Sequence, residues 1–164
     1  FTSVAAPVER PHRDRIVITG DSPEAMEEPL WCQGFVDLHS QTRSHRMTGA
    51  TSNPDFESMH REHLKKILWL RGGDRYVAKN NYHVTRMEYL LKLYPDAHFI
   101  VPIRDPVDHV MSLVRQHALF CQYAADNARI AYHLAAAGHF EFGPQRLPIG
   151  IDVEDSLATC EAWD

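Results

Sequence analysis

The chain has 164 residues, of which 44% are hydrophobic and 24% are charged, with a formal net charge of -5 and an isoelectric point near 6.1. This length is enough for one domain with a real core. The acidic balance argues against a general nucleic-acid binder, which is usually basic. No apolar run approaches the roughly 18 residues of a membrane-spanning helix, and the opening FTSVAAPVER lacks a signal-peptide pattern. We therefore expect a cytoplasmic protein without a membrane segment or a nucleic-acid partner.

The two ends of the sequence predict an incomplete domain. The first residue is not Met, and a helical pattern restarts near Glu154 shortly before the chain stops. We therefore expect residues 1–164 to form a single partial domain, truncated at both ends.

The cysteine and histidine spacings predict no metal site. Cys32, Cys121 and Cys160 are far apart and odd in number, which favours reduced thiols over a disulfide scaffold or a zinc site. His60 and His63 are three residues apart, so they do not form the HExxH pattern of zinc proteases.

The first predicted elements are short. Residues 15–19 (RIVIT) are rich in β-branched side chains and predict a strand. Ser22 is suited to cap a helix that begins at Pro23, and Pro29 should end or kink this helix after one or two turns. The helix would carry three carboxylates: Glu24, Glu27 and Glu28.

A long polar loop precedes the first long helix. Residues 33–52 follow neither the helical nor the strand period, and a loop of this length in a compact domain is functional or disordered. Asn53 and Pro54 have the residue types of a helix start, and Gly72 and Gly73 those of a helix end. A helical apolar stripe lies between them.

Residues 75–120 alternate between strand and helix patterns. Strands are predicted at 76–78 and 99–103, each followed by an apolar helical stripe, from residue 84 and from residue 106. A further helical stretch covers 121–137. This alternation predicts the α/β class, with a three-layer arrangement in which helices flank a parallel sheet.

Polar side chains follow both predicted strands. Lys79 and His83 come after the first strand, and Arg104 comes after the second, directly before a helix that Asp105 and Pro106 begin. Ligands of open parallel sheets bind at the carboxyl ends of the strands. The Arg104 guanidinium at a helix start suits a phosphate, and Ser112 could donate to the same group. Alternatively, Arg104 pairs with one of the nearby aspartates.

Three stretches resemble the sulfotransferase family, in its bacterial-type branch. IVPIRDPVDHVMSL is similar to the family's 3′-phosphate motif, YVAKNNYHVTRMEYLLKLYPDAHF to its preceding strand–helix segment, and SPEAMEEPLW to an upstream acidic turn. The resemblance covers about residues 20–120. It implies a P-loop-NTPase-like sulfotransferase fold and transfer of a sulfuryl group from 3′-phosphoadenosine 5′-phosphosulfate (PAPS) to an acceptor hydroxyl or amine.

The resemblance also implies roles for individual residues. Arg104 and Ser112 would hold the 3′-phosphate of PAPS, Lys79 would lie near the sulfuryl oxygens, and His83 would be the general base. The family's members that act on phenols and steroids carry this histidine two residues after the lysine, where the present chain has Asn81. A carboxylate among the three glutamates is the alternative base.

One family element is not found. The Gly-rich loop that holds the 5′-phosphosulfate does not occur in this sequence, so we expect the excerpt alone to be inactive. This leaves a non-catalytic adenosine-phosphate-binding module as the alternative function. A nucleotide kinase would need a Walker loop and a magnesium-binding acid, and neither is present. The acceptor is expected to be a small molecule, lipid or carbohydrate, with residues 33–52 in its pocket.

Overall fold

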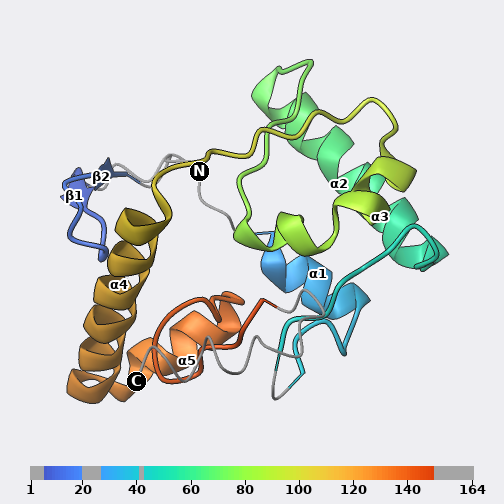
Figure 1. Ribbon diagram of the computed structural model, residues 1–164. Coiled ribbons are helices and arrows are strands. Elements are labelled where there is room, and N and C mark those ends of the chain that lie inside the picture. Colours follow the sequence, from blue (N-terminus) through green and yellow to red (C-terminus); the bar gives the residue numbers. More distant parts are fainter. Residues whose placement is uncertain (1–5, 20–26, 41–42, 150–164) are drawn as a thin grey trace.

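The computed structural model describes residues 6–19, 27–40 and 43–149. In chain order, the elements of the described residues are β1 (Val8–Glu9), β2 (Val17–Ile18), α1 (Glu28–Gly34), α2 (Pro54–Arg71), the 3-10 helix η1 (Asn81–Thr85), α3 (Met87–Leu93), α4 (Pro106–Asp126) and α5 (Ala128–Ala136). Helices α1, α2 and α3 with η1 lie on one side of the molecule, and α4 and α5 lie on the other (Figure 1).

The main core forms around Trp31 of α1, which is completely buried. Its ring lies 4.7 Å from that of Phe56 and 6.2 Å from that of Tyr89, measured between centroids. Further buried members come from the loop after α1 and from α3: Leu38, Met47, Leu90 and Leu93. Aromatic pairs of this kind stabilise a core beyond the area that they bury.

A buried ion pair lies inside this core. Arg86, between η1 and α3, is completely buried, and its Nη2 donates to Glu28 Oε1 at 2.7 Å and to Oε2 at 2.9 Å. The Arg86 guanidinium carbon also lies 4.4 Å from the centroid of the Trp31 ring. The pair therefore ties the first turn of α1 to the turn between η1 and α3.

Residues 138–149 join the two sides of the molecule. Phe140 N donates to the Tyr82 hydroxyl at 2.9 Å, and Ser44 N donates to Pro148 O at 3.0 Å. Gly138 adopts a φ of 74°, and a Cβ built there would lie only 2.6 Å from Glu28 Cγ. Only glycine tolerates both this backbone conformation and this close approach.

A second, smaller cluster attaches the β1–β2 hairpin to α4. The ring of Phe120 lies 5.1 Å from His12 and 5.8 Å from Phe142. Gln116 Nε2 donates to His12 O at 2.9 Å, and the Tyr123 hydroxyl donates to Pro11 O at 3.2 Å.

The predicted helix boundaries at Asn53 and Asp105 are confirmed. Asn53 Oδ1 accepts from Phe56 N at 3.1 Å, and Asp105 Oδ1 accepts from Val107 N at 2.9 Å. Gly72 follows α2 as predicted. Helix α4 extends beyond the apolar stripe predicted from residue 106. It continues to Asp126, and Asn127 then caps α5.

The predicted parallel sheet is not found in the described residues. Residues 76–78 and 99–103 have no strand pairing there, and the described sheet is the two-stranded antiparallel pair β1–β2. Of the predicted strand 15–19, two residues are paired. Val77 and Ile100 are exposed by 85% and 93%. A strand needs a neighbour for its backbone hydrogen bonds and cover for its apolar face, and the described residues supply neither to these two segments.

Two finer expectations concern the helices, and Ser22 and Pro23, the predicted start of the first helix, lie outside the described residues. Pro29, expected to end or kink that helix, lies in the first turn of α1, where proline costs no hydrogen bond because that amide has no helical acceptor. On α4, Val110 lies on the apolar stripe predicted from residue 106 but is exposed by 42%, whereas Phe120, further along the helix, is buried.

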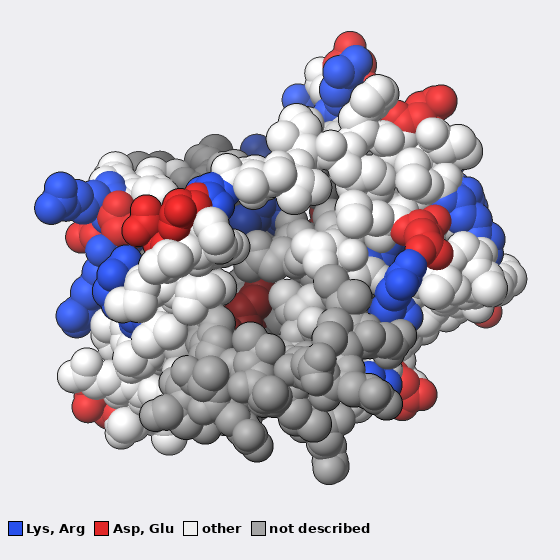
Figure 2. All heavy atoms as spheres, in the orientation of Figure 1, with Lys and Arg blue, Asp and Glu red and all other residues white. Residues whose placement is uncertain are grey.

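The visible surface carries mixed charge. Lys and Arg side chains are interspersed with Asp and Glu, and broad uncharged areas lie between them (Figure 2). Among the described residues, no helix combines the length and the apolar character needed to cross a membrane.

Gly34→Ala should destabilise the fold. A Cβ at this position would lie 2.2 Å from Phe56 Cδ2, inside the ring that packs on Trp31. Overpacking of this kind typically costs about 1–3 kcal/mol. Urea unfolding measures the loss, and Gly49→Ala is the matched control because a Cβ added there would have no atom within 4 Å. Equal stability of the two variants would contradict this account of the core.

Candidate functional site

His83 and Glu27 face each other at the edge of the core. His83 lies in η1, and its Nε2 is 3.6 Å from Glu27 Oε2 at the residue before α1. The Tyr76 hydroxyl donates to Glu27 Oε1 and so holds the other carboxylate oxygen. The structure thus brings the predicted base His83 together with one of the three glutamates considered as its alternative.

Burial keeps the His83 imidazole neutral. Burial lowers the pKa of His83 to about 4, against a partial opposing effect of the Glu27 charge, and the Arg86 charge lowers it further. His83 Nδ1 is buried and has no hydrogen-bond partner among the described residues. A neutral imidazole is the form that accepts a proton, so this state is compatible with a base.

Glu28 is not available as a base. Burial raises the pKa of its carboxyl group, but hydrogen bonds from His39 and the charge of Arg86 outweigh this effect, so the pKa is lowered overall. His39 Nε2 lies 2.7 Å from Oε1, and Asn80 Nδ2 donates to Oε2 at 2.8 Å. Of the three glutamates considered as alternative bases, Glu24 lies outside the described residues. Of the other two, Glu28 is engaged in the core, so Glu27 is the more accessible carboxylate.

Lys79 lies on the extended segment just before η1. Its side chain is exposed and makes no hydrogen bond or ion pair with the described part of the chain. Asn80, the next residue, is fixed at both ends of its amide, because Oδ1 accepts from Tyr82 N at 2.9 Å and Nδ2 donates to Glu28. The backbone beneath Lys79 is therefore held while its ammonium group is free to meet a ligand.

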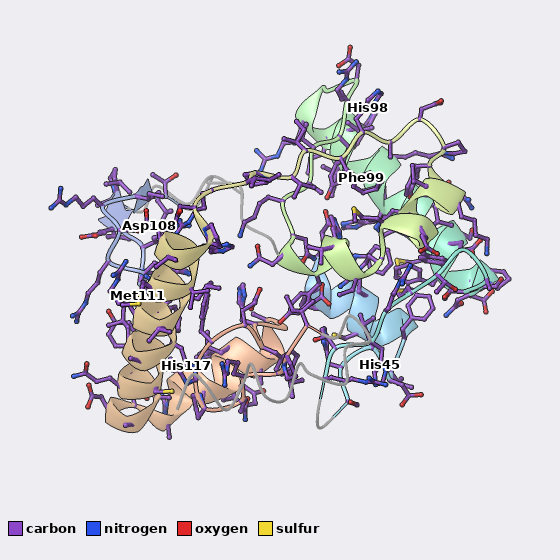
Figure 3. The ribbon with its side chains drawn as sticks, in the orientation of Figure 1. His45, His98, Phe99, Asp108, Met111 and His117 are labelled. Atoms are coloured by element: carbon purple, nitrogen blue, oxygen red, sulfur yellow. The ribbon has the colours of Figure 1, made fainter. Side chains whose placement is uncertain are left out.

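Arg104 and Ser112 lie at the start of α4. Arg104 is exposed and its Nη2 donates to the backbone oxygen of Asp108 at 2.9 Å, so it pairs with neither aspartate carboxylate. Ser112 is half-buried two turns into the helix. Figure 3 marks these places by Asp108 and by Met111, the neighbour of Ser112. Within the described residues, no hydrogen bond or ion pair joins these two residues to Lys79 or His83.

The loop after α1 forms a pocket. A hollow of about 420 Å³ is lined by residues 34–38 and 45–47 and by Thr51, with Phe35, Leu38 and Met47 among its apolar lining. Met47 N donates to Thr85 O at 2.8 Å, which attaches this wall to η1. The buried Trp31 ring contacts both sides, with its centroid 6.5 Å from that of Phe35 on the pocket wall and 6.2 Å from that of His83.

One group of side chains has potential metal ligands but does not suit a metal. The ligand atoms of Glu28, Cys32 and His39 lie within 4.8 Å of one another. Glu28 already accepts from the Arg86 guanidinium, so a divalent cation would lie against a buried positive charge. Burial and the Glu28 charge also raise the pKa of the Cys32 thiol, which opposes the thiolate that a metal needs.

Comparison with known proteins gives one decisive match. The model of the sulfotransferase family matches residues 20–146, most of the chain. The chain belongs to the sulfotransferase family. Searches of curated proteins and of solved structures found no match. Membership supports a transferase activity in general and leaves the donor, the acceptor and the roles of individual residues to be proposed.

The sequence prediction missed the central role of Arg86. A signal was present, because Arg86 continues the helical stripe of Tyr89, Leu90 and Leu93, all of which are buried. A charged residue on an apolar stripe is expected to have a buried partner. The sequence holds no equivalent indication of which carboxylate that partner is.

Stability should fall as the pH drops from about 6.5 to about 4. Burial lowers the pKa of His60, as it does that of His83, from 6.5 to about 4. Between these values the unfolded chain binds more protons than the folded protein, so acid favours unfolding, with up to about 3 kcal/mol from His60. Urea unfolding at a series of pH values measures the slope.

His60→Gln should flatten this slope, whereas His98→Gln, at an exposed position, should leave it unchanged. A His60 variant with the full wild-type slope would show that this imidazole is not buried in its neutral form.

Proposed function

We propose that this sulfotransferase transfers a sulfuryl group from PAPS to a hydroxyl or amine of a small-molecule, lipid or carbohydrate acceptor. The observation that carries the proposal is the contact between His83 and Glu27 within a chain of this family. This contact sets a neutral imidazole and a carboxylate side by side, and the exposed Lys79 lies four residues before His83 in the chain. Such a set can remove a proton and neutralise negative charge on a transferring group.

The reaction is an in-line displacement at sulfur. The acceptor oxygen or nitrogen bonds to the sulfur, the bond from sulfur to the bridging phosphate oxygen breaks, and adenosine 3′,5′-bisphosphate leaves. The acceptor's proton passes to the His83–Glu27 pair. As in phosphoryl transfer, orientation and charge neutralisation supply most of the acceleration.

His83 is the first proton acceptor of the pair. With Nε2 facing the Glu27 carboxylate, the tautomer protonated at Nε2 is favoured, which leaves the lone pair on Nδ1. Nδ1 is buried, so the acceptor has to enter next to η1 and displace the side chains that cover it. Glu27 then stabilises the imidazolium that forms.

Arg104 and Ser112 bind the 3′-phosphate of the donor. The Arg104 guanidinium is exposed and engages one backbone oxygen, so most of its donors are available. Asp105 already accepts from the amides of Val107 and Asp108 in the first turn of α4. The phosphate therefore depends on the guanidinium more than on the helix amides.

Pairing of residues 76–78 with 99–103 as parallel strands would complete the arrangement. Lys79 and Arg104 directly follow these segments, so pairing brings both cations to one edge of a sheet. The exposed apolar side chains of Val77 and Ile100 are consistent with strands that become covered. In this arrangement Lys79→Ala weakens donor binding as well, though less than loss of the Arg104 fork.

Arg104→Ala should weaken the binding of adenosine 3′,5′-bisphosphate by about 1.5–3 kcal/mol, the usual value of a hydrogen bond to a charged group. Isothermal titration calorimetry measures the change. Arg115→Ala, an exposed arginine on the same helix, is the matched control and should change the affinity by less than about twofold. Equal affinities of wild type and Arg104→Ala would exclude the phosphate role.

His83→Ala should lower the rate of sulfuryl transfer about a hundredfold or more with little change in donor affinity, because a general base acts in the transition state. Glu27→Gln should have a smaller effect. The assay is run on the full-length protein and follows release of adenosine 3′,5′-bisphosphate with a panel of acceptors. A larger loss in Glu27→Gln than in His83→Ala would move the base role to the carboxylate. Donor binding without release by the wild type would favour the non-catalytic module.

A further inference from the structure

Arg86, near the proposed base, is held by contacts on three sides of its guanidinium. Its Nη2 reaches both oxygens of Glu28, its Nε donates to Tyr82 O at 3.2 Å, and its guanidinium lies over the Trp31 ring. A planar guanidinium bound in this way on three sides has a single available orientation. Nη1 is buried and has no partner among the described residues.

Each member of the His83–Glu27 pair is attached to one member of this ion pair. Glu27 directly precedes Glu28 in the chain. Arg86 N donates to the backbone oxygen of His83 at 3.1 Å, within the turn that ends η1. The Glu28–Arg86 ion pair therefore holds the two backbone segments together close to the His83–Glu27 contact. Glu28 is one residue from Glu27, and Arg86 is three residues from His83.

The same carboxylate also reaches the segment of Lys79. Asn80 Nδ2 donates to Glu28 Oε2, and Asn80 is the residue after Lys79. His39, whose Nδ1 lies 2.7 Å from the hydroxyl oxygen of Ser44, holds the other oxygen of Glu28. The buried Glu28 carboxylate is thus linked, through neighbouring residues, to the segments that carry Glu27, His83 and Lys79.

We propose that Arg86 is the positioning residue of this site: by anchoring Glu28, it sets Glu27 and His83 against each other and fixes the backbone beneath Lys79. The inference rests on the proposed function for its effect on rate, but its effect on geometry is independent of any activity. Small displacements of reacting groups cost large factors in rate, so a residue that never touches the substrate can still govern turnover.

The test is the double variant Glu28→Leu with Arg86→Met. It removes the buried charges together and keeps the apolar volume, a change that proteins commonly tolerate. The charged and titratable groups that face His83 are Glu27 and Glu28 at the start of α1, His60 of α2, and Arg86. Because the variant removes one negative and one positive neighbour, their direct effects on His83 largely cancel. A change in the titration of His83 then reports loss of its position.

The imidazole of His83 is followed by NMR. In the double variant its titration midpoint should rise by about one pH unit or more toward 6.5, the value of a solvated histidine. The turnover number should fall about tenfold or more, with the KM for PAPS changed by less than about twofold. The matched control is Arg46→Met with Glu88→Leu, which removes an exposed ion pair and should leave the His83 signals unchanged.

An unchanged midpoint and turnover number in the double variant would overturn the role of Arg86. Arg86→Lys is the second variant: it keeps the charge but loses the two-oxygen contact, and it should also shift the His83 signals if the double variant does not fold. If Arg86→Lys has wild-type signals, the proposal is likewise wrong. A wild type without transfer activity would reject the proposed function, while the titration still decides the role of Arg86.

Discussion

The arrangement of the core depends on the buried ion pair between Glu28 and Arg86. A carboxylate and a guanidinium out of contact with water carry a desolvation cost of several kcal/mol each, and they remain charged only when the geometry of their contact is good. That requirement is met here by two hydrogen bonds from Arg86 and by further donors from Asn80 and His39. Because these donors come from separate segments, satisfying one carboxylate brings α1, η1 and the loop after α1 together.

This constraint explains the chemistry of the neighbouring groups. The same packing that excludes water from Arg86 also excludes it from His60 and His83, so both imidazoles are neutral near pH 7. Glu27 is displaced by only one residue from the buried carboxylate, yet it faces Tyr76 and His83 at the edge of the core. Two adjacent glutamates therefore have different surroundings: Glu28 lies inside the core, paired with Arg86, and Glu27 lies at its edge, where we propose that it takes part in proton transfer.

Local sequence signals predicted the helices well. The caps at Asn53 and Asp105 and the stop at Gly72 lie where residue type and the hydrogen bonds of a helix end require them. Local sequence signals could not predict in the same way whether the strands form. Residues 76–78 and 99–103 have the composition of buried strands, but a strand forms only with a partner, and composition does not reveal whether that partner is present.

The site was predictable in part. His83 and Lys79 were proposed because an imidazole and an ammonium follow one apolar segment, and of the three glutamates considered as alternative bases the structure sets Glu27 against His83. The pairing of Glu28 with Arg86 joins residues 58 positions apart, which no periodic pattern encodes. Arg104 and Ser112 were proposed from the spacing around a helix start, and their link to the other cluster depends on a sheet that local signals cannot establish.

The most direct test of the central claim is a double-mutant cycle on Glu28 and Arg86, measured as free energies of unfolding in urea. Glu28→Leu and Arg86→Met should each cost about 3–5 kcal/mol, because each leaves one buried charge without its partner. The double variant should lose less than either single variant, since both charges are then gone. If the loss in the double variant equals the sum of the two single losses, the ion pair does not hold this structure together.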